Sequence, residues 1–110
     1  MLKLEPVIPF EPVPAERIPA GPGWTAQIKW DGVRVLACFD GRDLRLFNRK
    51  RRERTVQYPE LHDPSSWCSA SSFIVDGEMI AFDRSKPSFH EIMKRDGLRR
   101  PERVREAARR

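Results

Sequence analysis

The first 23 residues hold six of the ten prolines in this 110-residue chain. Each proline fixes its own φ angle and lacks a backbone N–H, so a helix or a central strand is excluded over residues 1–23. We expect this segment to run extended over the surface of the fold. The apolar side chains expected to hold it there are Leu4, Val7, Ile8, Phe10 and Ile18.

The composition indicates one small soluble globular domain, with 39% hydrophobic and 34% charged residues. There is no apolar run near 18 residues and no basic-then-apolar leader, so we expect a cytoplasmic protein without membrane contact. Cys38 and Cys68 lack the spacing of a zinc site, and we expect both to be reduced core residues.

Positive charge is concentrated in two stretches of the chain, whose formal net charge is +5. Residues 49–54 read Arg-Lys-Arg-Arg-Glu-Arg, and residues 84–110 hold ten Lys or Arg against four acidic residues. Two basic patches on a small domain favour a polyanion such as nucleic acid as partner. Such runs also serve as solubilising surface, and charge alone does not separate these two interpretations.

Alternation of apolar and polar residues predicts strands after the proline-rich segment. Residues 24–31 alternate with period two, which places Gln27, Lys29 and Asp31 together on one face of a predicted strand. Residues 33–39 and 44–47 predict a hairpin around a turn at 40–43. We expect this hairpin to bring Asn48 and Arg49 back near Lys29, with the basic loop 50–54 beyond them.

The most apolar run, residues 73–82, predicts a strand with Asp76 and Glu78 on one face. Carboxylates inside an apolar strand cost several kcal/mol unless a cation meets them. A lysine, an arginine or a bound metal ion satisfies that need. The alternative is a strand at the edge of the sheet, bulged at Gly77, with both acids in water.

Capping signals predict short helices around these strands. Pro59 suits the first turn of a short helix, and Ser88 with Glu91 has the spacing of a capping box. The apolar stripe of this second helix is Phe89, Ile92 and Met93, and Gly97 ends it. Pro101 opens a last helix over 102–110. The predicted fold class is α+β, an antiparallel β-sheet with flanking short helices.

The pattern Lys29-x-Asp31-Gly32-x-Arg34 places an amine and a guanidinium close together at the end of a strand. This layout suits the binding of a phosphate and nucleophilic attack on it. The alternative is an ordinary Asp-Gly hairpin turn with Lys29 and Arg34 solvated beside it.

Together, four motifs resemble the first half of the adenylation domain of ATP-dependent DNA ligases, in its bacterial and archaeal form. They are Lys29 to Arg34, Asn48-Arg49, Tyr58-Pro59-Glu60-Leu61 and Asp76-Gly77-Glu78. The resemblance covers about residues 4–96 and implies an enzyme with an incomplete ATP-grasp-like nucleotidyltransferase domain. It divides the chain into an extended segment 1–23, the ligase-like part 24–96, and a basic C-terminal helix or tail 97–110.

The resemblance implies a reaction and a role for each matched residue. Lys29 attacks the α-phosphate of ATP to give lysyl-AMP, AMP passes to the 5′-phosphate of a DNA nick, and the 3′-hydroxyl then seals the strand. The implied nucleotide-binding residues are Gln27, Asp31, Arg34, Arg49 and Glu78, with Glu78 also near a magnesium ion. Arg34, Arg49, Lys50, Arg51 and Arg52 are the implied contacts to nicked duplex DNA. The pathways implied are DNA repair, replication and recombination.

Later parts of the ligase pattern do not occur within these 110 residues: an aromatic that stacks on adenine, a glutamate motif, a lysine pair and a small barrel domain. We therefore expect the chain alone to adenylate weakly or not at all. We also expect self-association or a companion chain to cover an incomplete sheet. Two other functions remain open: an RNA ligase or capping-type nucleotidyltransferase, and a non-catalytic nucleic-acid-binding module.

Overall fold

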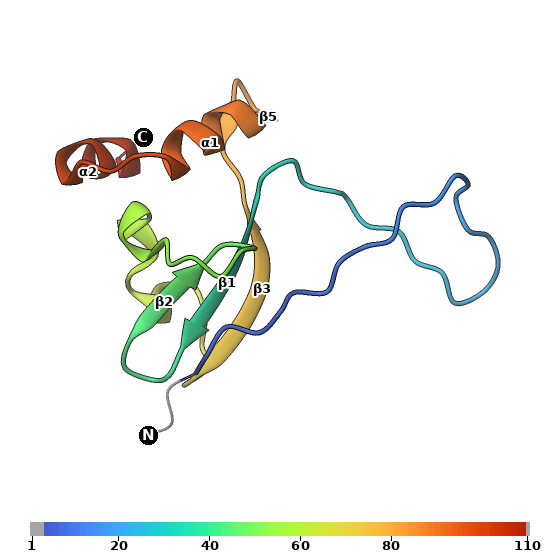
Figure 1. Ribbon diagram of the computed structural model, residues 1–110, viewed down its shortest axis with the longest axis horizontal. Helices are drawn as coiled ribbons and strands as arrows, with labels where there is room; N and C mark the ends of the chain where they lie inside the picture. The colour runs from blue at the N-terminus through green and yellow to red at the C-terminus, as the bar shows by residue number, and fades with distance from the viewer. Residues whose placement is uncertain (1–3, 110) are drawn as a thin grey trace.

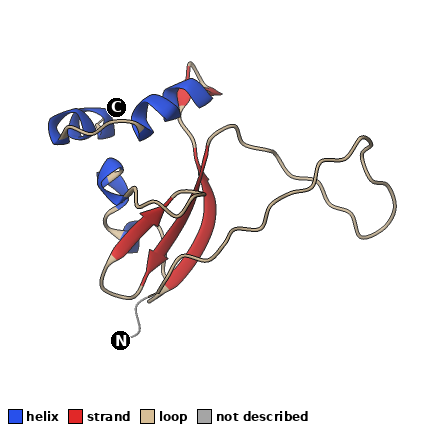
Figure 2. Ribbon diagram, in the orientation of Figure 1, coloured by secondary structure: helices blue, strands red, loops and turns tan. Residues whose placement is uncertain are grey.

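The computed structural model describes residues 4–109, which form an α+β arrangement of antiparallel sheets and short helices (Figures 1 and 2). The main sheet has the strand order β2-β1-β3. Its strands are β1 (Val33–Phe39), β2 (Leu44–Phe47) and β3 (Phe73–Met79). Two short strands, β4 (Phe82–Asp83) and β5 (Lys86–Pro87), form a second sheet. The helices are α1 (Phe89–Asp96) and α2 (Pro101–Ala108), with 3-10 turns η1 (Thr55–Gln57), η2 (Pro59–Leu61) and η3 (Pro64–Ser66).

The β1–β2 hairpin has the bounds that the sequence predicts. Its turn is closed by Asp40, whose carboxylate accepts hydrogen bonds from the backbone N–H groups of Arg42 at 2.9 Å and Asp43 at 2.8 Å. Gly41 has a φ of +96°, a conformation that costs a glycine little. Local turn chemistry therefore fixes this part of the sheet.

Strand β3 pairs antiparallel with β1 along its whole length, from Val33 opposite Met79 to Phe39 opposite Phe73. Gly77 lies directly opposite Val35 in an unbroken register, so the bulge of the alternative interpretation is absent. The predicted strand 73–82 also ends early, because the chain leaves the sheet after Met79 to form the β4–β5 hairpin. No strand within residues 4–109 pairs with the outer edge of β3, so its edge position is confirmed.

The hydrophobic core lies on one face of the main sheet. Its buried residues are Ala37, Leu46, Tyr58 and Ile92. Ile92 comes from α1, whose N-terminus is capped as predicted: the Ser88 hydroxyl accepts a hydrogen bond from the Glu91 N–H at 3.2 Å. Of the predicted stripe on α1, Ile92 is buried, whereas Phe89 and Met93 are nearly half exposed. Helix α2 begins at Pro101 as predicted and buries Val104.

The opposite face of the sheet, which we call the site face, buries Leu36, Cys38 and Phe47 with Leu4 packed against them. We call residues 4–11 the strap. Arg45 donates a hydrogen bond to the carbonyl oxygen of Leu4, which holds the start of the strap on this face. Both cysteines are free in the described part of the chain; Cys38 is buried as predicted, whereas Cys68 is only half-buried, so its predicted place in the core is wrong.

Of the five side chains expected to hold the N-terminal segment, only Leu4 packs on the fold. Val7, Ile8, Phe10 and Ile18 are 52–94% exposed, so their predicted role is wrong. Val7, Ile8 and Phe10 lie in the strap and are still exposed, whereas Ile18 is exposed because the chain has left the sheet by this point (Figure 1).

Residues 12–31, the arm, are all exposed and contain no helix or strand. Because the arm projects from the sheet (Figure 1), the radius of gyration is 16.0 Å, against roughly 13 Å for a compact domain of this length. The predicted strand over 24–31 is therefore wrong. Alternation shows which side chains share a face, but a strand also needs a hydrogen-bonded neighbour, and none of the described strands pairs with this segment.

No helix within residues 4–109 is long and apolar enough to span a membrane.

Candidate functional site

Gly32 fixes the junction between the arm and β1. A Cβ atom at this position would lie 2.2 Å from the Met79 carbonyl oxygen and 2.9 Å from Cγ2 of Ile80. Only glycine lets the backbone pass so close to the end of β3. Asp31-Gly32 does not join two paired strands, so the interpretation as a hairpin turn is wrong. Gly32 instead lets the backbone at the end of the arm pack closely against the last residues of β3.

Three candidate residues lie on the arm just before this junction. Gln27, Lys29 and Asp31 are exposed and have no hydrogen bond or ion pair with another residue of the described chain. The structure therefore leaves the Lys29 amine accessible.

Arg34 and Asp76 form a two-point ion pair across β1 and β3. The guanidinium Nε lies 2.9 Å from Oδ1 of Asp76, and Nη2 lies 2.5 Å from Oδ2. Arg34 is thus the cation that the sequence required for a carboxylate on this strand. The hydrogen bonds to Asp76 raise the pKa of Arg34 despite desolvation, and they lower the pKa of Asp76. Glu78 lies directly opposite Arg34 in the strand register.

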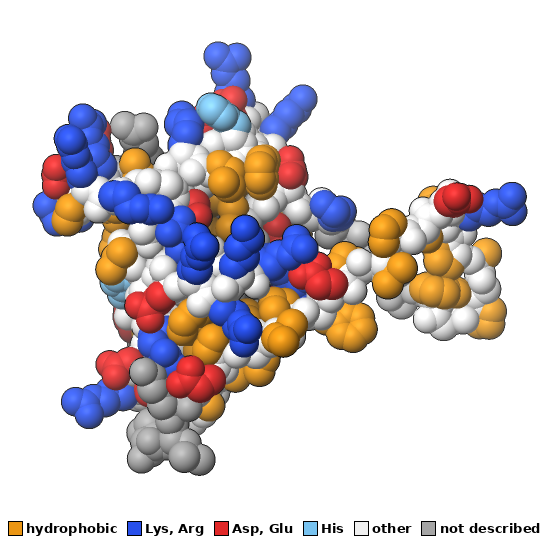
Figure 3. All heavy atoms as spheres, in the orientation of Figure 1, with side chains coloured by type: hydrophobic (Ala, Val, Ile, Leu, Met, Phe, Trp, Pro, Cys, Tyr) orange, Lys and Arg blue, Asp and Glu red, His pale blue; other side chains and the backbone are white. Residues whose placement is uncertain are grey.

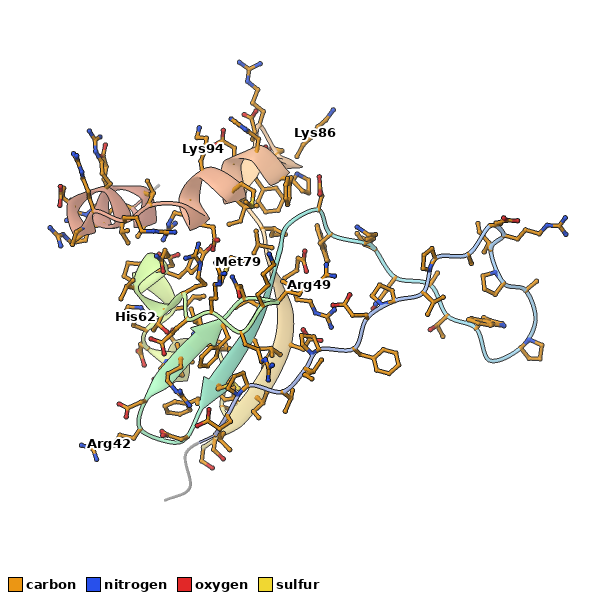
Figure 4. The ribbon with its side chains drawn as sticks, viewed as in Figure 1. Arg42, Arg49, His62, Met79, Lys86 and Lys94 are labelled. Carbon is orange, nitrogen blue, oxygen red and sulfur yellow. The ribbon has the colours of Figure 1, made fainter. Side chains whose placement is uncertain are left out.

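Arg49 reaches back to the strap. Its Nε lies 3.0 Å from Oε1 of Glu11, and both side chains are about half exposed or more. Figure 4 shows Arg49 pointing toward the N-terminal segment. The Glu11 carboxylate also helps to raise the pKa of Arg34. One acidic side chain therefore acts on two of the candidate phosphate-binding arginines, and sequence reasoning missed it because its partner is 38 positions away.

The basic loop after β2 is ordered around Asn48. Its side-chain oxygen accepts hydrogen bonds from the backbone N–H groups of Lys50 at 3.0 Å and Arg52 at 2.9 Å. Arg51 takes a left-handed conformation with a φ of +63°. Lys50, Arg51 and Arg52 are all exposed. Figure 3 shows Lys and Arg side chains gathered across this part of the molecule. The loop presents positive charge from a fixed backbone.

Arg54 anchors the end of this loop to α1. It donates hydrogen bonds to the Asp96 carboxylate at 2.6 Å and to the Asp96 carbonyl oxygen at 2.7 Å. The Tyr58 hydroxyl donates to the same carboxylate at 2.6 Å, and burial is the largest cause that raises the Tyr58 pKa above its ordinary value. No local sequence signal marks this buried network, because its members are about 40 residues apart.

The described residues include no cluster of three or more His, Cys, Asp or Glu able to hold a metal ion. Asp76 is occupied by Arg34, so Glu78 is the carboxylate on the site face that has no ion pair in the described structure. A single carboxylate together with substrate phosphates is a donor set that Mg²⁺ accepts.

Residues 15–109 match the family model for the ATP dependent DNA ligase domain. The chain belongs to this family. It is 34% identical over 73 residues to the multifunctional non-homologous end joining DNA repair protein LigD of Mycobacterium tuberculosis, covering 66% of this chain and 10% of LigD. It is 38% identical over 69 residues to a DNA ligase of Haloarcula marismortui, covering 61% of this chain and 12% of that protein.

A probable DNA ligase of Anaeromyxobacter is 36% identical over 100 residues, which covers 86% of this chain and 19% of that protein. The chain thus spans only about a tenth to a fifth of the length of these DNA ligase relatives. No solved structure matches it. The family resemblance found in the sequence motifs is confirmed.

Proposed function

We propose that this chain supplies the first part of a DNA ligase adenylation site, within an ATP-grasp-like nucleotidyltransferase fold. The observation that carries the proposal is the close passage of Gly32 over Met79. This contact holds the Lys29 end of the arm beside the strand pair that bears Arg34 and Glu78. We therefore propose that the Lys29 amine, the Arg34 guanidinium and the Glu78 carboxylate belong to one site.

In the proposed reaction, Nζ of Lys29 attacks the α-phosphorus of ATP and forms a nitrogen–phosphorus bond. The bond from this phosphorus to the bridging oxygen breaks, and pyrophosphate leaves with the electron pair. AMP then moves to the 5′-phosphate of a nick, and the 3′-hydroxyl displaces it to seal the strand. The exposed position of Lys29 leaves the amine open to ATP.

Arg34 and Arg49 are the proposed phosphate contacts in this reaction. A planar guanidinium offers paired donors that match phosphate oxygens. Asp76 fixes the orientation of Arg34 through its two-point contact, so this group is preorganised before any ligand binds. Gln27 offers an amide oxygen to the amino group of adenine, and Asp31 lies in the same nucleotide-binding segment.

Glu78 is the residue proposed to hold Mg²⁺ together with the phosphates of ATP. When bound, the ion offsets the charge that builds on those phosphates. The donor set fits because Glu78, unlike Asp76, forms no ion pair with an arginine within residues 4–109, although its charge also acts on Arg34. Glu78 therefore keeps its carboxylate available on the site face.

Lys50, Arg51 and Arg52 are proposed to contact the backbone of nicked duplex DNA. These side chains project from a loop whose backbone is fixed by Asn48, so little backbone entropy is lost on binding. Each neutralised phosphate releases counterions, which makes the binding weaken steeply with salt.

Self-association or a companion chain is proposed to cover the parts of the fold that the described residues leave open. The outer edge of β3 has no strand beside it within residues 4–109, and Trp24 and Ile28 on the arm are 64% and 70% exposed. Unpaired strand edges and exposed apolar side chains favour such contacts. Sedimentation as a monodisperse monomer would argue against self-association.

Intact mass spectrometry after incubation with ATP and Mg²⁺ tests the proposed chemistry. We expect a small fraction of the chain to gain one AMP at Lys29, and none in Lys29→Ala. Lys86→Ala is the matched control, since it removes an exposed lysine from β5. An adduct that persists in Lys29→Ala would overturn the role of Lys29. No adduct at all would leave either a ligase scaffold that needs the later motifs or the non-catalytic binding module, and binding of nicked duplex that is unchanged in Lys29→Ala would favour the module. Labelling by GTP rather than ATP would favour a capping-type enzyme.

A further inference from the structure

Glu11 is the last residue of the strap and places its carboxylate on the site face. The strap is held near its start by the buried contacts of Leu4 and by the hydrogen bond from Arg45 to the Leu4 carbonyl oxygen. Pro9 is buried as well. Glu11 then meets Arg49 at 3.0 Å. An anionic group of the chain itself thus lies where a bound anion would meet this arginine.

Three of the ion pairs between an arginine and a carboxylate involve Arg34 or an arginine at an end of residues 49–54, and they differ in exposure. In the Arg54–Asp96 pair the side chains are 16% and 10% exposed, and in the Arg34–Asp76 pair 21% and 44%. In the Arg49–Glu11 pair they are 71% and 48% exposed. Exposed pairs contribute little stability because water and salt screen them. The contact between Arg49 and Glu11 is therefore the one that a ligand exchanges most easily.

We propose that Glu11 is an internal competitor for phosphate at Arg49 and that it sets the affinity of the site face for phosphate monoesters. A monoester carries a charge of about −1.5 to −2 at neutral pH and has three strong acceptor oxygens, whereas the carboxylate carries a single charge. An anion that binds the Nε edge of Arg49 must replace Glu11. Only an anion that binds Arg49 more strongly than a carboxylate gains by the exchange.

The exchange also affects the strap. Glu11 immediately precedes the arm, which leads to Lys29, so its release removes the last contact that holds the start of the arm near the basic loop. Because Glu11 and phosphate compete for Arg49, phosphate binding weakens the Glu11 contact, and removal of the Glu11 charge strengthens phosphate binding. The inference rests on the proposed function only for the identity of the phosphate as the 5′ end of a nick.

The first experiment titrates inorganic phosphate into the full chain and follows the arginine Nε–H signals by NMR. Glu11→Gln is expected to lower the dissociation constant for phosphate about two- to fivefold, as removal of an exposed ion pair predicts. Glu16→Gln is the matched control, because Glu16 is an exposed glutamate on the arm with no ion pair in the described structure. The role of Glu11 would be overturned by equal dissociation constants for Glu11→Gln and wild type. It would also be overturned if Glu16→Gln lowered the dissociation constant as much as Glu11→Gln.

The second experiment measures binding of nicked duplexes that carry a 5′-phosphate or a 5′-hydroxyl at the nick. Glu11→Gln is expected to tighten binding of the phosphorylated nick about two- to fivefold and to leave the hydroxyl form unchanged. If the titration succeeds but no variant distinguishes the two nicks, the proposed ligase function fails while the role of Glu11 stands. If wild type prefers the phosphorylated nick but the titration shows no effect of Glu11→Gln, the role of Glu11 fails while the proposed ligase function stands.

Discussion

Replacing Gly32 by alanine tests the close contact on which the candidate site depends. The new Cβ would lie 2.2 Å from the Met79 carbonyl oxygen, well inside the 3.4 Å at which ordinary contact begins. A carbonyl oxygen of the backbone cannot rotate away, so β3 or the start of β1 must shift. Overpacking of this kind costs about 1–3 kcal/mol. The expected result is a fall in the free energy of unfolding by that amount, measured by urea denaturation.

Gly77→Ala is the matched control on the neighbouring strand, and its expected effect has the opposite sign. No atom lies within 4 Å of a Cβ built on Gly77, and its φ is not in the left-handed region. Alanine in a strand interior is favoured over glycine by about 0.5–1 kcal/mol, so Gly77→Ala should stabilise the fold. If the two variants changed the free energy of unfolding alike, the steric reasoning about Gly32 would be refuted.

Two further predictions concern the ion pairs. Arg34 lowers the pKa of Asp76, so this carboxylate adds stability above its unfolded pKa, near 3.8, and the gain is lost as pH falls through the lower folded value. In Asp76→Asn the free energy of unfolding should therefore fall less steeply as pH is lowered, which urea denaturation at neutral to acidic pH measures. The same steepness in wild type and variant would contradict this. Asp96→Ala leaves Arg54 and the Tyr58 hydroxyl without their partner and should cost about 3–5 kcal/mol, against about 1 kcal/mol for Tyr58→Phe. A smaller loss in Asp96→Ala than in Tyr58→Phe, by urea denaturation, would show that the carboxylate is not the centre of the network.

The parts of the fold that the sequence predicts correctly are those decided by local chemistry. The turn at Asp40 and the cap at Ser88 use side chains that bond to backbone two or three residues away, so their signals lie within a short window. The strand predicted over 24–31 fails for the opposite reason. Its pattern is right for a strand, but a strand depends on a neighbour far along the chain, and no alternation of residue types contains that information.

The same distinction applies to the candidate site. Arg34 and Glu78 come together because the antiparallel pairing of β1 with β3, which begins at Phe73 as predicted, puts them opposite each other. The contacts of Glu11 and Asp96 join residues about 40 positions apart that carry no motif, so only the folded chain reveals them. Sequence reasoning therefore finds reactive groups more readily than the groups that hold or compete for them.

The pairs Arg54–Asp96, Arg34–Asp76 and Arg49–Glu11 differ in exposure, and therefore in how easily they exchange partners. The basic loop is fixed at its Arg54 end by a buried pair that salt screens little, because the Asp96 carboxylate is surrounded by protein rather than water. At its other end Arg49 holds an exposed carboxylate of the strap, which screening weakens directly. A loop that is rigid at one end and exchanges partners at the other can receive an anion without reordering its backbone. In the proposed exchange, binding at Arg49 costs the displacement of Glu11, whose charge also acts on Arg34.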